Sequence, residues 1–405
     1  MIKGNLEIFN NIQNEHLNKY SLKKLYKDFN FFEKEIKENI KNSKKTLNVL
    51  SKNYEVNFKT KDLEKFKKFN KIAILGMGGS ILGAESIYSF LEKKIKKKFY
   101  FFDNLDPNKN TYFKKKENLE KVLFIIISKS GETVETLSNL LSLNILKNRA
   151  KNIIVISEKK NNSLYCISKK FNLFFIEHKE NIGGRYSVLS EVGLVPAYLM
   201  GLDIKKLRSN ILSFLNGKKK LFLKKSSVKL ANLLKHNKIQ NIIYLNFAPE
   251  MEKFLFWCQQ LIGESLGKKG KGFLPVISNV PKDHHSLLQL YLEGPRDKLF
   301  HIFSANNTSK EKVKSKNILK SHNYLDQKKL NKIKNAQKKA LIKILKIKKI
   351  PYREFKIKTL NEEMIGELFS YFILETVIIG RISKLNPFDQ PAVEQVKIIT
   401  KKILN

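Results

Sequence analysis

Five short apolar runs, separated by segments long enough to form helices, constrain the fold of this chain more than any other feature. The runs occupy residues 71–76, 96–103, 122–127, 152–157 and 171–177. Their hydrophobic character is continuous rather than alternating, which is typical of strands covered on both faces. The pattern therefore predicts an α/β fold with a doubly wound parallel sheet. In such a sheet, ligands bind beside the carboxyl ends of the strands.

A second series of apolar runs follows at residues 241–247, 273–278, 298–304 and 351–357. These runs again alternate with helical segments. They predict a second parallel-sheet domain of the same class, so we expect two doubly wound domains in tandem.

This pattern divides the chain into four parts. Residues 1–70 alternate charged and apolar positions at helical spacing and are predicted to form an N-terminal helical segment. Residues 71–202 and 203–385 are the two expected domains, and residues 386–405 are a C-terminal turn and helix. Residues 307–350 are so rich in Lys that we expect a segment lying on the surface, with helical parts.

The charge of the chain is strongly positive, at +41 from 78 basic and 37 acidic residues over 405 positions. Nucleic-acid binding proteins favour Arg, whose planar guanidinium contacts phosphates and bases through two bonds, but only six of these basic residues are Arg. The Lys residues are spread along the whole chain. This distribution favours a solvated Lys coat, and we expect no specific nucleic-acid partner.

The cysteine content and hydropathy favour a cytoplasmic protein without a membrane partner. Cys166 and Cys258 are too few for a disulfide framework and lack metal-ligand spacing. The N-terminus has no apolar stretch of the secretory kind. The longest apolar candidate, residues 369–379, is interrupted by Glu375 and is shorter than the roughly 20 residues that cross a bilayer.

A hydroxyl-rich loop, SKSGETVET at residues 128–136, joins the third predicted strand to a helix. Unpaired backbone N–H groups and the positive end of a helix dipole at such a position bind phosphate. Ser128, Lys129, Ser130 and Thr133 are the candidate ligands. The alternative interpretation is an ordinary helix N-cap, although one hydroxyl is enough for capping.

A glycine-rich turn, GMGGSILG at residues 76–83, follows the first predicted strand. A dinucleotide-binding fingerprint would need Gly or Ala at position 81, where this chain has Ile. Gly79 and Ser80 instead offer close backbone approach and one hydroxyl, as a sugar monophosphate requires. The alternative is a plain tight turn between strand and helix.

Two candidates for the chemistry are an arginine and a glutamate. Arg185, in GGRYSVLSEVGL, follows the fifth predicted strand, and its guanidinium would stabilise negative charge on a substrate oxygen. A structural ion pair with Glu180 or Glu191 is the alternative. Glu264, in QQLIGESLGK, is a candidate general base near a helix end, although a glutamate taken alone is more often an ordinary surface residue.

Four further residues are less specific candidates. His284 and His285 are adjacent, so on a helix they point in different directions and are poor joint metal ligands. We expect no metal, and one His available for proton transfer. Gln390 and Lys397, in NPFDQPAVEQVK, lie on a turn and on the terminal helix, and Lys397 has no distinction of its own among so many lysines.

Taken together, these stretches resemble the glucose-6-phosphate isomerase family, which is built from two sugar-isomerase domains. The resemblance runs in the same order over about residues 70–400, from GMGGSILG through SKSGETVET, GGRYSVLSEVGL, QQLIGESLGK and HHSLLQL to NPFDQPAVEQVK. It implies the reversible isomerisation of glucose 6-phosphate and fructose 6-phosphate through ring opening and a cis-enediolate, in glycolysis and gluconeogenesis.

The resemblance also implies the role of each residue. Glu264 matches the base that moves a proton between sugar C1 and C2, and Arg185 matches the residue that stabilises the enediolate. His285 and Lys397 match the pair that opens the sugar ring. The remaining positions match the residues that bind the substrate and its phosphate: Gly79, Ser80, Ser128, Lys129, Ser130, Thr133 and Gln390.

In this family the ring-opening His comes from the partner subunit, so the resemblance implies a homodimer with His285 supplied across the interface. The reaction involves no redox change and implies no cofactor. Where the family usually has a Gly-Thr turn and Gln before the catalytic His, this chain has Pro281, Lys282, Asp283 and His284, so the choice of His285 over His284 rests on its spacing to Gln289.

Two other functions stay open on the sequence. One is a broader isomerase that also accepts mannose 6-phosphate. The other is a regulatory protein that binds a sugar phosphate on the same fold, although it would have no need for Glu264, Arg185 and Lys397 together.

Overall fold

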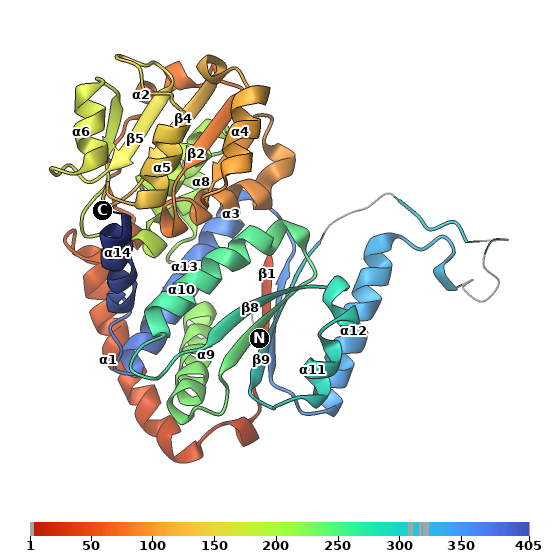
Figure 1. The fold of residues 1–405 in the computed structure, drawn as a ribbon. Coiled ribbons are helices and arrows are strands. Elements are labelled where there is room, and N and C mark those ends of the chain that lie inside the picture. Colours follow the sequence, from red (N-terminus) through yellow and green to blue (C-terminus); the bar gives the residue numbers. More distant parts are fainter. Residues whose placement is uncertain (1–3, 307–310, 316–317, 319–323, 405) are drawn as a thin grey trace.

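A computed structural model describes residues 4–306, 311–315, 318 and 324–404. Two five-stranded sheets form separate layered units, which Figure 1 shows above and below a group of long helices. The predicted α/β class with two parallel sheets is confirmed.

The first sheet contains the five strands predicted in the first half of the chain. They are β2 (Lys71–Leu75), β3 (Lys98–Phe102), β4 (Val122–Ile127), β5 (Ile153–Ser157) and β6 (Phe174–Glu177). All are parallel, in the order β3-β2-β4-β5-β6. From β2 the chain adds β3 on one side, and it then adds β4, β5 and β6 on the other side, so the strand order reverses between β2 and β4. Such a switch point leaves a crevice beyond the carboxyl ends of the two strands, and the loops after both strands are the two that the sequence singled out.

Helices cover both faces of this sheet. They are α3 (Leu82–Leu91), α4 (Pro107–Lys116), α5 (Val134–Ser142), α6 (Ser163–Lys170) and α7 (Glu191–Leu199). Asp106, Asn162 and Ser190 cap three of them by accepting backbone N–H bonds. Because both faces are covered, every residue of β4 is buried.

The second sheet has the order β1-β10-β9-β7-β8. Four of its strands are those predicted in the second half: β7 (Asn241–Asn246), β8 (Leu274–Asn279), β9 (Lys298–Ala305) and β10 (Tyr352–Ile357). They are mutually parallel.

The fifth strand, β1 (Leu6–Asn11), corrects the expectation that residues 1–70 are helical throughout. It pairs antiparallel with β10, with Leu6 opposite Ile357. Leu6 and Ile8 alternate inward, a period that fits a strand, and they are buried. Helix α1 (Lys19–Lys41), further along the same segment, is amphipathic as predicted. The domain boundaries given above stay a prediction, but the second sheet takes one strand from the N-terminal segment.

Long helices join the two sheets. Helix α10 (Glu252–Leu266) packs against α3 of the first unit and α13 (Glu362–Ile382) of the second. Helices α8 (Ile204–Ser209) and α9 (Gly217–His236) pack on α13 as well. Figure 1 shows α10 and α13 between the sheets, with α14 (Pro391–Leu404) at the side of this junction.

The Lys-rich segment contains helix α12 (Leu330–Ile347), which confirms the expected helical part. Other positions of that segment, residues 307–310, 316–317 and 319–323, lie outside the described residues. No helix within the described part of the chain is long and apolar enough to cross a membrane.

Candidate active site

Arg185 is the centre of the candidate site. It lies in the short turn Gly184–Leu189 after β6, and only 2% of its surface is exposed. A guanidinium has five N–H donors, and each one is used here. The bonds are Nε to Ser265 Oγ (2.8 Å), Nη1 to Glu264 Oε2 (2.9 Å) and Gln390 Oε1 (2.8 Å), and Nη2 to the carbonyls of Pro387 (2.6 Å) and Asp389 (3.1 Å).

These bonds settle which acid Arg185 pairs with. The sequence left Glu180 and Glu191 as alternatives, but Glu180 contacts Lys160 and Glu191 accepts bonds from Tyr54 and the backbone N–H of Asn57. Glu264, 79 positions away in the chain, is the partner. The structure therefore brings three of the predicted site residues, Arg185, Glu264 and Gln390, into one network.

The Glu264 carboxylate is held at both oxygens. Oε2 accepts from Arg185, and Oε1 accepts from Gln260 Nε2 at 2.9 Å. Gln260 lies one turn earlier on α10, and sequence reasoning missed it although the i, i+4 spacing was available. With 30% of its side chain exposed, Glu264 stays reachable from solvent while its orientation is fixed.

Tyr186 and Ser265 support the same network and were also missed. The fully buried Tyr186 hydroxyl donates to the Pro387 carbonyl at 2.6 Å and lies 2.9 Å from Ser265 Oγ. Burial raises the pKa of Tyr186, so the hydroxyl keeps its proton and remains a donor. The turn before α14 is thereby bonded to two adjacent residues of the Gly184–Leu189 turn.

The glycine-rich turn after β2 touches this network through its backbone. A Cβ on Gly79 would lie 2.2 Å from the carbonyl carbon of Gly184 and 2.5 Å from the Arg185 nitrogen. Gly78 has a φ of +51°, and a Cβ there would meet the Gln260 amide at 2.6 Å. The backbone of Gly79 therefore lies directly against that of Gly184 and Arg185, and the positive φ of Gly78 favours glycine beside the Gln260 side chain.

The hydroxyl-rich loop departs from ordinary helix capping. Thr133 occupies the N-cap position of α5, yet its side chain makes no capping bond. Its Oγ1 lies 2.8 Å from Ser128 Oγ instead. Ser130 Oγ accepts from the Glu132 N–H at 3.2 Å. The hydroxyls of Ser128 and Thr133 thus converge at the start of α5, where a phosphate would meet unpaired N–H groups.

The start of α6 holds the hydroxyl-rich loop in place. Gly131 has a φ of +69° and packs so closely on Asn162 that a Cβ would lie 1.8 Å from its side-chain oxygen. The Glu132 carboxylate accepts from the N–H and the hydroxyl of Ser163, at 2.5 and 2.8 Å. Lys129 lies 3.7 Å from Glu158, and burial lowers the pKa of its ammonium group.

The two loops are neighbours at the switch point of the first sheet. A Cβ on Gly76 would lie 3.1 Å from the carbonyl oxygen of Ile127, so the ends of β2 and β4 are in contact. The hydroxyl-rich loop leaves one of these strand ends, and the glycine turn that touches Arg185 leaves the other. This is the position at which open α/β sheets bind ligands.

His285 does not join the site within one chain. Helix α10 runs antiparallel to β8: Glu252 at its start bonds Asn279 at the end of β8, and Gln259 bonds Pro275 near the beginning of β8. Glu264 therefore lies past the amino end of β8, whereas His285 follows its carboxyl end and is exposed. The length of the strand, about 20 Å, separates them.

His284 differs from its neighbour. Its Nε2 is buried without a hydrogen-bond partner among the described residues, and its ring packs 5.9 Å from Phe247. Burial, with His285 nearby, lowers the pKa of His284. His285 is the one of the two that faces solvent.

Lys397 also lies apart from the network. Every residue of α14 before Thr400 is exposed, and Lys397 Nζ contacts Glu394 at 2.7 Å on the same helix. The turn before α14 is anchored, because Asp389 accepts from Lys268 at 2.6 Å and Gln390 accepts from Arg185. The first turn of α14 thus begins at a fixed point beside Glu264, and the rest of the helix projects from it.

Comparisons with known proteins agree on one family. The family model described as phosphoglucose isomerase matches residues 33–405. A probable glucose-6-phosphate isomerase of Methanococcus maripaludis is 33% identical over 99% of this chain and 90% of its own length. A glucose-6-phosphate isomerase of Methanocaldococcus jannaschii is 32% identical over 85% and 87%. In fold, a hypothetical protein of Thermus thermophilus superposes with a TM-score of 0.83 at 22% identity, covering 98% of this chain and 99% of its own.

The contact between Gly79 and Gly184 can be tested by adding one methyl group. We expect Gly79→Ala to destabilise the protein by about 2–3 kcal/mol, because its Cβ would overlap backbone atoms that cannot move without displacing Arg185. Gly263→Ala is the matched control, since a Cβ there has open space on a helix, and it should be neutral or stabilise by up to about 1 kcal/mol. Urea unfolding of both variants measures the difference, and equal stability would contradict the close contact.

Proposed function

The chain belongs to the phosphoglucose isomerase family, and we infer from this that it interconverts glucose 6-phosphate and fructose 6-phosphate. We propose further that the residues of the candidate site perform the reaction in the roles that follow. The observation that supports these roles best is the contact between Glu264 and Arg185, a carboxylate and a cation held together at an accessible point.

In the proposal, the loop of residues 128–133 holds the sugar phosphate. Ser128, Ser130 and Thr133 supply hydroxyls, Lys129 supplies charge, and the start of α5 supplies backbone N–H groups. Gly79 and Ser80 lie along the middle of the substrate. Binding the phosphate at this fixed point positions the other end of the sugar without taking part in bond making.

Glu264 is the proposed base. It takes the proton from C2 of the open-chain aldose, and the same carboxyl group returns that proton to C1. The electron pair of the broken C–H bond forms the C1–C2 double bond and the carbonyl π pair moves to O1, so the intermediate is an enediolate with negative charge on oxygen. When C1 takes the proton, the proton of the C2 hydroxyl passes to O1 and the carbonyl forms at C2. Gln260 holds one carboxylate oxygen, which leaves the group oriented for both transfers.

Arg185 is the proposed stabiliser of the enediolate, but all its donors are occupied. A substrate oxygen can gain an N–H bond only by exchange, and the Gln390 amide is a neutral acceptor that leaves at lower cost than the Glu264 carboxylate. We propose that Gln390 gives up its bond to Nη1 as the substrate binds, and that its amide then contacts the sugar.

Ring opening requires groups that are not assembled in one chain. We propose a homodimer in which His285 of the partner subunit reaches the site that contains Glu264, which the separation along β8 supports. Lys397 reaches the sugar if α14 packs over the site about its anchored first turn. Exposed apolar residues on that helix, Val396, Ile399 and Ile403, would be covered by such packing.

Two alternative functions differ in what they require. A broader isomerase that also accepts mannose 6-phosphate is compatible with Glu264, because glucose and mannose differ at C2, the carbon that this base deprotonates. A regulatory sugar-phosphate sensor would use the phosphate loop without the contact between Glu264 and Arg185, so that contact favours the enzyme. We also propose a cytoplasmic location, in keeping with two free cysteines.

Replacing the base tests the central role. We expect Glu264→Gln to lower kcat for fructose 6-phosphate by at least ~10² and to leave substrate binding within a few fold, because the amide keeps the shape and cannot accept the proton. Glu252→Gln, at the other end of α10, is the matched control. A coupled assay and calorimetric titration measure both variants, with mannose 6-phosphate as a second substrate. Turnover near the wild-type level would remove Glu264 from the mechanism.

Co-expression of two inactive variants tests the shared site. In a heterodimer of Glu264→Gln with His285→Ala, one of the two sites combines the intact Glu264 of one chain with the intact His285 of the other. Random pairing makes half of the dimers mixed, so we expect about one quarter of wild-type activity. Each variant alone should be almost inactive.

The outcome separates the two arrangements. If His285 acted within its own chain, no site in the mixed dimer would be complete, and activity would stay at the background of the single variants. His284→Ala paired with Glu264→Gln is the control for the neighbouring histidine. The assignment would be overturned if His284→Ala alone were inactive and regained activity when paired with Glu264→Gln, while His285→Ala alone kept its activity.

A further inference from the structure

A cavity of about 810 Å³ lies at the edge of the first sheet opposite the phosphate loop. Its walls come from the residues just before β2, β4 and β5, which are the amino ends of these strands, and from the loop after α5. The candidate active site lies at the carboxyl ends of the same strands. The cavity is therefore separate from the isomerase site.

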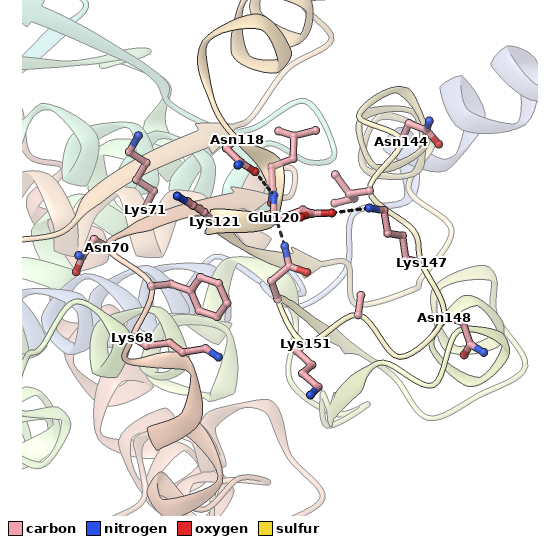
Figure 2. A pocket seen from close by; sticks show the side chains of 15 residues that line it. Lys68, Asn70, Lys71, Asn118, Glu120, Lys121, Asn144, Lys147, Asn148 and Lys151 are labelled. Atoms are coloured by element: carbon pink, nitrogen blue, oxygen red, sulfur yellow. Dashed lines mark hydrogen bonds and ion pairs between the residues drawn. The ribbon is translucent and has the colours of Figure 1, made fainter.

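The cavity is rich in cations. Lys68, Lys71, Lys121, Lys147 and Lys151 line it, and Glu120 is the one acidic residue among them. Lys71 pairs with Glu117, and Lys147 pairs with Glu120. No ion pair is found for Lys68, Lys121 or Lys151 within the described part of the chain. In the view of Figure 2, Lys68 and Lys151 lie on one side of the cavity and Lys121 lies across from them.

The negative ends of helices do not account for these three lysines. Helix α5 ends near the cavity, and Lys114 donates to the carbonyl of Ser142, its last residue. Over the described residues, the ammonium groups of Lys68, Lys121 and Lys151 donate to no carbonyl. Their charge is available to a ligand.

Four apolar residues also line the cavity, and together we call them the apolar floor. It consists of Phe69, Leu119, Ile145 and Ala150, and Lys68 Nζ lies 5.5 Å from the centre of the Phe69 ring. Asn152 braces the floor by donating to the carbonyls of Leu119 and Val122 at 3.0 and 2.9 Å. A ligand that suits these walls has a flat apolar part and several negative charges.

An adjoining cavity of about 420 Å³ shares Lys68, Ala150 and Lys151 with the first and adds Lys65 and Arg149. The loop between them holds two residues in the left-handed region, Asn144 at φ 53° and Arg149 at φ 57°. Such conformations are uncommon outside glycine and are retained where the surroundings enforce them. The two cavities share part of their basic lining, and together they are called the groove below.

We propose that this groove binds a nucleoside polyphosphate, with the base on the apolar floor and the phosphates on Lys68, Lys121 and Lys151. The volume lies within the range of roughly 300–1,000 Å³ that small-molecule sites occupy. Several cations around one cavity match a polyphosphate, and the apolar floor matches the aromatic base. The inference does not depend on the proposed isomerase mechanism.

The test is calorimetric titration with ATP at physiological salt and saturating fructose 6-phosphate, so that the phosphate loop is occupied. The site variant carries Lys68→Gln, Lys121→Gln and Lys151→Gln. The control variant carries Lys23→Gln, Lys24→Gln and Lys27→Gln, all exposed on α1, and has the same net charge. We expect at least a ~10-fold weaker Kd for the site variant and less than a ~2-fold change for the control.

Four results would overturn the proposal. One is no binding of ATP to the wild type at millimolar concentration, and another is equal weakening in both triple variants, which would indicate a general effect of the Lys coat. Binding of ATP that fructose 6-phosphate abolishes would place the nucleotide in the isomerase site. If inorganic tripolyphosphate bound as tightly as ATP, the base would contribute nothing to binding and would not contact the apolar floor. All six lysines are exposed, so both variants should fold, and urea unfolding checks this.

Discussion

The five hydrogen bonds of the Arg185 guanidinium are the interaction on which the candidate site depends. They join three segments that are far apart in the chain: the turn after β6, the end of α10 and the turn before α14. Arginine suits this position because its donors form a rigid planar fork, whereas the single ammonium group of lysine would satisfy fewer acceptors in other directions. The buried charge is offset by Glu264 and by oriented carbonyl dipoles, which makes the arrangement costly to break from one side.

The glycine contacts connect this network to the phosphate loop. Gly79 touches the backbone of Gly184, and Gly76 touches the end of β4, so backbone contacts position the turn that carries Arg185 relative to the hydroxyl-rich loop. Such a frame suits a reaction in which a remote, unreactive group fixes the reacting carbons. Binding free energy from the phosphate end can then lower the barrier at the carbon end.

The strands of both sheets could be predicted from the sequence because burial on both faces leaves continuous apolar runs. Strand β1 could not, because its six residues lie among charged helical patterns and its partner β10 comes almost at the other end of the chain. Arg185 and Glu264 could be named from their motifs, but their contact could not. Sequence proximity favoured Glu180 and Glu191, whereas the true partner is set by the packing of α10. Gln260 could have been found from its i, i+4 spacing to Glu264, whereas the role of Ser265 is visible only through its contacts with Arg185 and Tyr186.

The central claim is that Arg185 holds the Glu264 carboxylate, the proposed base, and the turn before α14 in one geometry. Arg185→Lys tests it most directly, with Arg296→Lys at an exposed position as the control. If the claim is right, Arg185→Lys lowers kcat for fructose 6-phosphate by at least ~10² and the free energy of unfolding by about 3 kcal/mol, since it breaks a buried network. Activity within a few fold of wild type, with stability matching the control, would contradict it.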